Sequence, residues 1–396
     1  MNYKLLLLII IVGVFVFGYV YFDLNQNRIH FHIVKINIKK DSNNYVDVTN
    51  EEEFILALEN SNYKIINIVN DLDLGFFSLQ KKEINSGYII KHNVPLTHPV
   101  LMKTGVSKLV LSNRNGLIIK SSNGSKILHC NIRIENSKNI KIENVSMEEL
   151  WEWDEVTGLE YDRNDWDYIT IKNSKNVIIS HCEFSKSYDG ITDIKESSNI
   201  VIEYCKLNEV DINNNDFYNI QFEELEKNQD KYPIYRFLRK NAKVSIDEIK
   251  QIFSCQAKLY LIGPEDYGPK NNNIIIHDCL FLNVRNRVPQ ARNSSVYVYN
   301  VYADSKKINI YKILTDKQIS YISSHYHIIV APSSYGVISI QRSYIVVENC
   351  IYDGADNPYT YTRNGKYSNI GRIIIKNNNK LKNLKENLLK KAGLIV

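Results

Sequence analysis

Several common signals are missing from this chain of 396 residues, and each absence removes a class of protein. The six cysteines include no C-x-x-C pair, so they show no zinc motif and do not decide the redox compartment. Charge is not gathered in blocks. The net charge of +5 is spread along the chain, which argues against a nucleic-acid-binding protein and is compatible with an anionic polymer as partner.

Charge is also absent from residues 5–22, which follow Lys4. A run of 18 uncharged residues is at the lower edge of what spans a bilayer. No A-x-A pattern marks a cleavage site at its end, so an uncleaved signal anchor is favoured over a cleaved signal peptide. Basic residues follow the run, and the positive-inside rule would therefore keep the rest of the chain in the cytoplasm. This conflicts with the extracellular location that the later motifs imply.

Helical stripes with a 3.6-residue period are missing from the strand-like segments beyond residue 130, and so is a leucine-repeat scaffold. Short runs of Ile and Val recur instead, several of them opening with Asn, and they end in Asn or Cys at spacings that include 23 and 21 residues. A repeat near 22 residues predicts a solenoid, and short strands predict a parallel β-helix. The segments are 139–144, 176–182, 199–205, 273–279, 296–300 and 344–350.

Alternation along these strands is expected to place Ile178 and Ile202 on one face and polar residues on the other. The Asn or Cys position is expected to form a ladder along the stack. Cysteines at this position are therefore interpreted as small buried residues, with disulfides between neighbouring rungs as the alternative; they are Cys182, Cys205, Cys279 and Cys350.

The repeat also sets the expected domain organisation. It comprises a signal anchor or signal peptide at 1–22, a linker at 23–44, a β-helix at 45–380 with an insertion at 209–255, and a C-terminal amphipathic helix at 381–396. Within the insertion, Ser245-Ile-Asp-Glu248 is a capping box that opens an apolar stripe at Ile246, Ile249, Ile252 and Phe253, which predicts a helix. The terminal helix is expected to cover an end or a side of the solenoid.

Four aspartates fall on two neighbouring predicted coils, namely Asp165, Asp167, Asp189 and Asp193. Residues two apart on an extended segment face the same way, so Asp165 and Asp167 converge, and stacking brings the second pair within reach. Carboxylates gathered in this way repel one another unless a cation lies between them, and hard oxygen ligands suit Ca²⁺. A solvated acidic face would give the same spacing.

Basic residues follow on later coils. Lys258 opens Lys258-Leu-Tyr-Leu-Ile-Gly263, and an R-x-P-x-x-R segment holds Arg287 and Arg292. Guanidinium groups suit sugar carboxylates because they form paired hydrogen bonds with them. Taken singly, each of these side chains is more often a surface charge than a ligand-binding group.

In order along the chain, these segments resemble polysaccharide lyase family 1, the pectate lyases, over roughly residues 130–360. The segment 165–171 is similar to the family's D-x-D-x-I strand, 189–195 to DGxxDIK, 258–263 to KxxLIG and 287–292 to RxPxxR. The segment ending at His181 is similar to VWIDH. Each motif is weak alone, but together they imply an all-β, right-handed, single-stranded parallel β-helix with helical insertions.

The resemblance also implies roles for these residues. Asp165, Asp167, Asp189 and Asp193 would bind Ca²⁺, Arg287 would remove the C5 proton of a galacturonate, Lys258 and Arg292 would bind substrate carboxylates, and His181 would support the substrate site. The protein would be a monomeric enzyme, secreted or membrane-anchored with its β-helix outside the cell, that acts on an acidic polysaccharide, polygalacturonate.

Departures from the family pattern are few. Ser180 stands where Asp is usual, Tyr297 where His is common and Asn293-Ser294 where a Gly is common. The long insertion before Lys258 is the largest departure, and it puts the preferred chain length of the substrate in doubt.

An arginine base is unusual because guanidinium normally keeps its proton, but a nearby Ca²⁺ and Lys258 would disfavour the protonated form. Hydrolysis would need two acids flanking the bond, whereas these acids are clustered, which favours β-elimination to 4,5-unsaturated products. Three alternatives stay open: a non-catalytic β-helix adhesin that retains a calcium site, a membrane-anchored structural protein that uses calcium for stability, and a lyase acting on another polyuronate.

Overall fold

The computed structural model describes residues 18–20, 31–41, 43–75, 79, 89–91, 106–151, 153, 155, 166–187, 189–208, 215–254, 258–263, 271–306, 313–325, 334–361, 371–376 and 384–391. Asp165 lies outside these residues. So does the expected signal or anchor at 1–22, apart from β1 (Gly18–Val20), which pairs antiparallel with β2 (Phe31–Ile33). Within the part of the chain just given, no helix combines the length and apolarity needed to span a membrane.

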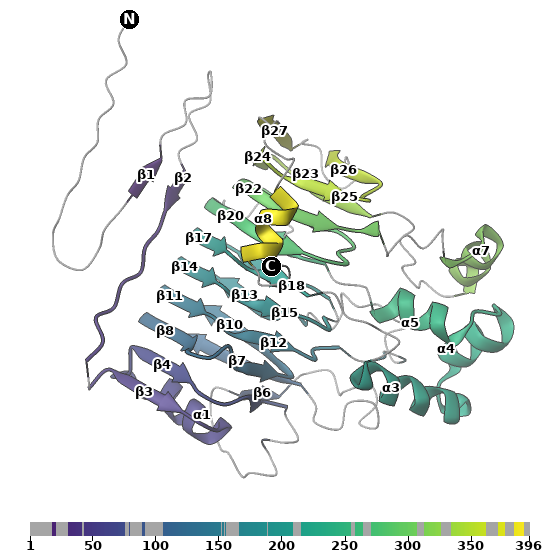
Figure 1. Cartoon of the computed structure of the whole chain (residues 1–396), viewed down its shortest axis with the longest axis horizontal. Helices are drawn as coiled ribbons and strands as arrows, with labels where there is room; N and C mark the ends of the chain where they lie inside the picture. The colour runs from purple at the N-terminus through teal and green to yellow at the C-terminus, as the bar shows by residue number, and fades with distance from the viewer. Residues whose placement is uncertain are drawn as a thin grey trace, which may run out of the picture.

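Parallel strands from successive coils stack along one axis, which confirms the predicted right-handed parallel β-helix (Figure 1). One wall is a nine-stranded sheet. Its strands, in spatial order, are β26 (Asn357–Tyr361), β23 (Tyr335–Ile340), β21 (Gln290–Arg292), β19 (Tyr260–Ile262), β16 (Thr192–Lys195), β13 (Ile169–Lys172), β10 (Cys130–Glu135), β7 (Ser107–Ser112) and β6 (Ile89–Lys91). Only β6 runs antiparallel to its neighbour in this sheet.

A sixteen-stranded sheet supplies the two other walls of the coil. The eleven-residue strands β20 (Asn271–Phe281) and β22 (Ser294–Asp304) pass through both walls, because β20 pairs with β17 along its first half and with β18 along its second. One wall holds β3 (Tyr45–Val48), β4 (Ile65–Ile68), β8 (Asn115–Ser121), β11 (Lys138–Glu143), β14 (Lys175–Ser180), β17 (Ser198–Glu203), β24 (Tyr344–Glu348) and β27 (Arg372–Lys376). The other holds β5 (Leu72–Asp73), β9 (Lys126–Leu128), β12 (Ser146–Glu148), β15 (Glu183–Phe184), β18 (Lys206–Leu207) and β25 (Ile351–Asp353).

An asparagine ladder fixes the register of the coils. The Asn199 amide donates to the side-chain oxygen of Asn176, 23 residues earlier, at 2.9 Å, and Asn176 donates to Asn139 at the same distance. Asn273 extends the ladder by donating to Asn199 at 3.0 Å. All four have φ between 56° and 58°, a left-handed conformation that asparagine tolerates better than most residues. The asparagines that open the repeated segments therefore form a ladder.

The cysteines that close those segments point into the core. Five cysteines are described, all of them are buried, and none forms a disulfide within the described residues. The thiol of Cys182 donates to the Ser180 carbonyl at 3.4 Å. The thiols of Cys205 and Cys350 likewise donate to the backbone carbonyl of the residue two positions earlier. The prediction of buried ladder residues is confirmed for Cys182, Cys205, Cys279 and Cys350.

The prediction that Ile178 and Ile202 share a face is wrong. Ile178 pairs with Val201, while Ile202 pairs with Ile179 inside the coil. Ile178 instead lies on the outer face of the sheet with Val201, Ile275 and Val346. These strands are apolar on both faces, so the outer face needs a cover of its own.

An N-terminal arm, residues 31–36, supplies that cover. Phe31 and Val34 are buried against the outer apolar stripe, and the rings of Phe31 and Tyr297 lie 5.4 Å apart. The arm is also held at the end of the asparagine ladder. Asn273 donates to the His32 carbonyl at 2.8 Å and accepts the His32 N–H at 2.5 Å.

Helices cover one end of the coil and parts of its sides (Figure 1). Helix α1 (Glu51–Glu59) buries Phe54 and Leu58 against the first coil. Between β18 and β19 lie α3 (Asp216–Lys227), the 3₁₀ helix η2 (Gln229–Lys231), α4 (Pro233–Arg236), the π-helix η3 (Phe237–Asn241) and α5 (Ile246–Ser254). Helix α7 (Asp316–His325) precedes β23, and α8 (Leu384–Lys391) packs its Leu388 against Leu280 and Tyr302.

The capping box predicted at Ser245 is confirmed. The Ser245 hydroxyl accepts the Glu248 N–H at 3.2 Å, and the Ser245 N–H donates to the Glu248 carboxylate at 2.6 Å. Ile249 and Ile252 of α5, which this box starts, are buried.

Candidate active site

The candidate residues lie where the chain enters neighbouring strands of the nine-stranded sheet. Asp167 precedes β13, Asp189 precedes β16, Lys258 precedes β19 and Arg287 precedes β21. These four strands are consecutive neighbours in the sheet. One corner of the coil therefore presents four of the predicted side chains in order, one for each turn of the solenoid.

Backbone hydrogen bonds hold the later turns of this corner together. The Lys258 N–H donates to the Asp189 carbonyl at 3.0 Å, and the Tyr260 N–H donates to the Arg287 carbonyl at 2.9 Å. A parallel bridge also joins Lys258 to Asn286. Because neighbouring strands lie about 4.8 Å apart, Arg287 is one turn from Lys258 and two turns from Asp189.

Close packing brings Asp167 to the same place. A Cβ atom on Gly190 would lie 1.8 Å from Asp167 Oδ1, so only glycine permits this approach. The side-chain amide of Asn131 also donates to the Asp167 carbonyl. Asp167 is thus buried directly against the backbone that follows Asp189.

Two lysines pair with the buried aspartates. Lys258 Nζ lies 2.6 Å from Asp189 Oδ1, and both side chains are almost fully buried. Lys195 Nζ lies 3.1 Å from Asp193 Oδ2, and Asp193 is paired with Thr170 of β13 and Leu261 of β19. A buried ion pair is costly to form, so the Lys258–Asp189 pair is more than a chance surface contact.

The predicted calcium ligands fit the ion in chemistry, although the quartet is not complete within the described residues. Asp167, Asp189 and Asp193 are buried hard-oxygen donors on adjacent coils, which is the donor type that Ca²⁺ prefers. No three acidic, His or Cys side chains among the described residues gather closely enough to hold a metal, and Asp165 lies outside them. The four-aspartate site therefore stays a prediction.

Arg287 precedes strand β21, and Arg292 is its last residue. Both side chains are partly exposed. The backbone of Arg287 has φ +64°, a left-handed conformation that is strained for an arginine, and such strain concentrates at functional sites. The Arg292 carbonyl accepts the Ser294 hydroxyl at 2.7 Å and lies against Gly263, where a Cβ would clash at 1.8 Å.

His181 is not brought to this corner. It follows β14 at a different corner of the coil, where its ring stacks on Tyr204 with centroids 4.8 Å apart. The VWIDH-like segment predicts the strand correctly, but His181, the residue after that strand, has a left-handed backbone and lies at the bend between the two walls of the sixteen-stranded sheet.

A helical cap is built from Trp151, Trp153 and Glu155, from α3 to α5, and from α7, and α5 ends shortly before Lys258. The ring centroids of Trp151 and Tyr218 lie 5.1 Å apart, and those of Trp153 and Tyr235 lie 5.5 Å apart. The Glu155 carboxylate accepts the Ile234 and Tyr235 N–H groups at the start of α4, at 2.9 and 3.0 Å. The rings of Phe237 and Tyr321 stack at 5.4 Å, which ties α7 to η3.

The cap joins segments from three coils. The segment that begins at Trp151 leads toward Asp167, the segment from α3 to α5 leads to Lys258, and α7 follows the coil that holds Arg287. No periodic pattern in the sequence indicated the partners of Trp151 and Trp153.

Comparison with known proteins identifies the family. No family model matches the chain. Pectate lyase B of Paenibacillus amylolyticus is 36% identical over 328 residues, which cover 81% of this chain and 83% of that protein. The chain belongs to the pectate lyase family.

Other relatives agree with this placement. The solved structure of the pectate lyase PelN from Paenibacillus sp. 0602 superposes with a TM-score of 0.79 at 33% identity, covering 85% of this chain and 77% of that one. A pectate trisaccharide-lyase of Thermotoga maritima is 35% identical over 85 residues, 22% of each chain. As members of the pectate lyase family are polysaccharide lyases, the chain is an enzyme of that class.

Two residues of this pectate lyase site were not singled out from the sequence. Gly190 permits the approach of Asp167, and Asn131 holds the Asp167 backbone. Gly190 belongs to the DGxxDIK-like segment, so the sequence shows that a glycine stands there. It does not show that Asp167 needs the space. Asn131 lies on the preceding coil, and nothing in its local sequence links it to Asp167.

Proposed function

We propose that this pectate lyase cleaves (1→4)-α-D-galacturonan by calcium-dependent β-elimination and releases 4,5-unsaturated oligogalacturonides. The observation that carries the proposal is the buried Lys258–Asp189 pair, stacked one turn from Arg287. This arrangement places a cation, a carboxylate and a guanidinium on three consecutive turns at one corner of the coil. A site for hydrolysis would instead need a protonated acid facing a second carboxylate across the bond.

The metal would be held by Asp165, Asp167, Asp189 and Asp193. When bound, Ca²⁺ supplies positive charge that neutralises the C6 carboxylate of the sugar and acidifies the adjacent C5 proton. The three described aspartates support this assignment, because they are buried hard-oxygen donors on adjacent coils, the donor type that Ca²⁺ prefers.

The chain's own residues would carry out the remaining chemistry. Lys258 and Arg292 bind substrate carboxylates and hold the ring in place. Arg287, in its neutral form, takes the C5 proton. The electrons of the C5–H bond form the C4–C5 double bond, the C4–O bond breaks, and the departing oxygen takes a proton from solvent.

The proposed setting follows from the substrate. A polymeric substrate is met outside the cell, so we propose that the β-helix acts there, either after secretion or while tethered through the N-terminal segment. We further propose that it acts as a monomer, since all the side chains invoked come from one chain.

A substrate assay tests this function. Purified protein is mixed with polygalacturonate and Ca²⁺, and the ultraviolet absorbance of unsaturated uronides is followed. We expect absorbance to rise, the rise to stop on addition of a chelator, and highly methyl-esterified pectin to react more slowly because it lacks the free carboxylates that Lys258 and Arg292 bind. Folded protein that gives no signal across neutral and alkaline pH contradicts the proposal.

The same assay separates the alternatives. A non-catalytic adhesin would bind polygalacturonate without any rise in absorbance. A protein that uses calcium only for stability would show a higher melting temperature with Ca²⁺ and no product. A lyase acting on another polyuronate would give the absorbance signal with that polymer in place of polygalacturonate.

A further inference from the structure

Each coil places one left-handed residue at the bend between the two walls of the sixteen-stranded sheet. Asparagine and aspartate tolerate this conformation best, and they occupy four of the six positions described at this bend. Two neighbouring coils carry aromatic rings instead; histidine is also tolerated in this conformation, but the bulky Tyr204 is an outlier that needs a reason. In order, the residues are Asn144, His181, Tyr204, Asp278, Asn300 and Asn349, with φ between 50° and 54°.

The aromatic pair interrupts a polar ladder. Asn349 donates to Asn300 at 3.5 Å, and Asn300 donates to Asp278 at 3.4 Å. The ladder stops there, because the next two positions hold the stacked rings of Tyr204 and His181. The Tyr204 side chain is exposed at 39%, and its hydroxyl has no hydrogen-bond partner among the described residues. The rings thus present an open aromatic surface where neighbouring coils make hydrogen bonds.

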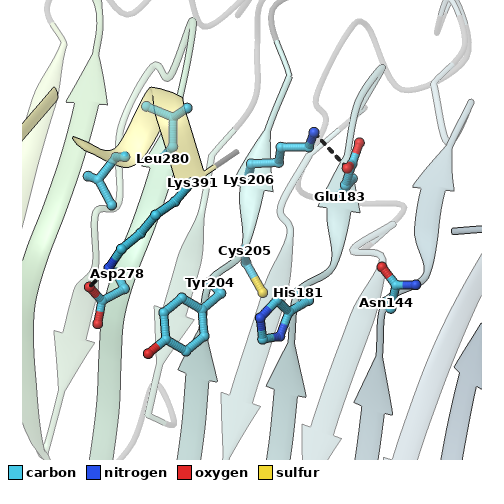
Figure 2. Close-up of a pocket in the computed structure, with 10 residues that line it drawn as sticks. Asn144, His181, Glu183, Tyr204, Cys205, Lys206, Asp278, Leu280 and Lys391 are labelled. Carbon is cyan, nitrogen blue, oxygen red and sulfur yellow. Dashed lines mark hydrogen bonds and ion pairs between the residues drawn. The ribbon is translucent and has the colours of Figure 1, made fainter. Parts of the chain in front are cut away.

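A cavity of about 380 Å³ lies over these rings. Figure 2 shows the rings side by side, with helix α8 and its Lys391 on one flank and Lys206 with Glu183 on the other. Lys206 Nζ is held 2.6 Å from Glu183. Asn144, Cys205, Asp278, Leu280 and Leu388 complete the lining. None of these residues lies at the corner that holds Asp189 and Lys258, although the sequence resemblance assigns His181 to the substrate site.

Lys391 is the more available of the two lysines. Its Nζ lies 3.4 Å from Asp278 Oδ1 and 5.7 Å from the centre of the Tyr204 ring, and 59% of its side chain is exposed. The ammonium group thus stands beside the aromatic surface with only a long ionic contact. A ligand carboxylate above Tyr204 would meet it without displacing the tighter Lys206–Glu183 pair.

The lining matches a sugar better than other ligands. A pyranose ring has an apolar face that covers an aromatic ring and an edge of hydroxyls that donate to carboxylates such as Asp278 and Glu183. The same two carboxylates disfavour phosphate polyanions, and the charged rim disfavours a purely apolar ligand. We propose that this cavity is a second, non-catalytic binding site for a uronic-acid saccharide, with the ring over Tyr204 and the carboxylate toward Lys391.

The choice of a uronate as the ligand rests on the proposed function. The inference that the cavity binds a sugar does not. The cavity lies at another corner of the coil from Asp189 and Lys258, so it does not extend the catalytic cleft. It would hold a distant part of a long polymer and keep the enzyme on its substrate. Short substrates, which fit the cleft alone, would not depend on it.

The test uses Tyr204→Asn in the full chain. Asparagine is the residue type that the neighbouring coils use at this left-handed position, so the variant is expected to fold. Affinity for polygalacturonate is measured by native gel electrophoresis over a series of polymer concentrations, with chelator present to prevent cleavage. Activity on trigalacturonate with Ca²⁺ is measured in parallel. Tyr321→Asn on α7, a tyrosine of similar exposure (38%) outside the cavity, is the control.

We expect Tyr204→Asn to bind polygalacturonate roughly threefold to tenfold more weakly, the size of one lost aromatic contact, with kcat/KM on trigalacturonate within about twofold of wild type. Tyr321→Asn should bind like wild type. Lys391→Met should also weaken binding, which separates a uronate from a neutral sugar.

Wild-type affinity in Tyr204→Asn overturns the site, and wild-type affinity in Lys391→Met overturns the choice of a uronate. Because binding is measured without turnover, a protein that binds through Tyr204 but cleaves nothing would support this site while contradicting the proposed function. A protein that cleaves but loses no affinity in Tyr204→Asn would do the reverse.

Discussion

At the scale of single residues, the candidate site depends on close approaches that only particular side chains allow. Gly190 has no Cβ, and Asp167 takes up that space. Lys258 reaches across one turn to Asp189, and the pair is buried. A charge in such a place interacts strongly with a bound anion because little water screens it.

The two lysines that pair with site aspartates offer a matched test. Lys258→Met is expected to lower kcat/KM on polygalacturonate by roughly 100-fold or more, because a buried cation aimed at developing negative charge is lost. Lys195→Met removes the more exposed partner of Asp193 and is expected to cost less than about fivefold. Steady-state kinetics on both variants measure the difference, and equal losses would contradict the assignment of Lys258.

A second charged group lies in the interior at His129. Its Nδ1 lies 2.8 Å from Asp73 and its Nε2 lies 3.3 Å from Glu149, which is itself 2.7 Å from Lys186. Burial works against the charged imidazole, but its contacts with the two carboxylates prevail and raise the pKa of His129 to about 9. For Glu149, burial is likewise outweighed by its contacts with His129 and Lys186, which lower its pKa to about 2.

The raised pKa of His129 predicts a pH-dependent stability. The folded state holds the proton more tightly than the unfolded state, so the stabilisation is complete below pH 6.5 and is lost as pH rises through about 9. The free energy of unfolding of the wild type should fall by on the order of 2–3 kcal/mol over this window relative to His129→Asn. Asparagine suits the left-handed backbone at this position, where φ is +57°.

Urea unfolding at several pH values measures this difference. His325→Asn, on the exposed end of α7, controls for the loss of a histidine. If the free energy of unfolding depends on pH in the same way for the wild type and His129→Asn, the charged His129 does not stabilise the fold as described.

At the scale of elements, the sequence predicts the strands but not the segments that pack over them. The leading asparagines and closing cysteines carry the 23-residue period, so the strands and the two ladders follow from the sequence. The runs around Ile178 and Val201 are apolar at every position, however, so alternation alone cannot assign a face. The outer face is covered by the arm, a segment that the sequence predicts to be part of the linker at 23–44.

The candidate site divides in the same way. Motif order predicted Asp167, Asp189, Lys258 and Arg287 at one corner, because equivalent positions of a solenoid stack. Motif order alone did not locate His181, because the left-handed backbone of this residue decides which way its side chain points. The aromatic contacts of the helical cap join residues such as Trp153 and Tyr235 that are far apart in sequence, and no local pattern encodes them.

The arm gives a prediction at this scale. Phe31→Ala removes a buried ring from the contact with Tyr297, a loss of about 3 kcal/mol that the short arm cannot compensate. We expect limited proteolysis before residue 41 to become at least tenfold faster, while the melting temperature of the β-helix changes little. Leu56→Ala, an exposed leucine on α1, should leave proteolysis unchanged. Unaltered cleavage in Phe31→Ala would mean that the ring does not hold the arm.

At the scale of the whole molecule, the solenoid separates tasks by face and corner. The corner at the nine-stranded sheet gathers the candidate catalytic side chains, and α5 of the helical cap ends shortly before Lys258. The outer face of β14 and β17 is closed by the arm. The bend of the sixteen-stranded sheet holds the aromatic cavity beneath α8. Because each coil repeats the same path, a residue changed at one corner leaves the others in place.

In the proposed mechanism, stacked turns deliver the guanidinium of Arg287 to the sugar ring held by Lys258. The most direct measurement is the initial rate of unsaturated product from polygalacturonate and Ca²⁺ for Arg287→Ala. Arg342→Ala is the control, because Arg342 also has a left-handed backbone and lies in the turn between β23 and β24. We predict a loss of roughly 1,000-fold for Arg287→Ala with melting temperature and polymer binding retained, and a near wild-type rate for the control. A folded Arg287→Ala variant that keeps a rate within about tenfold of wild type would contradict the account.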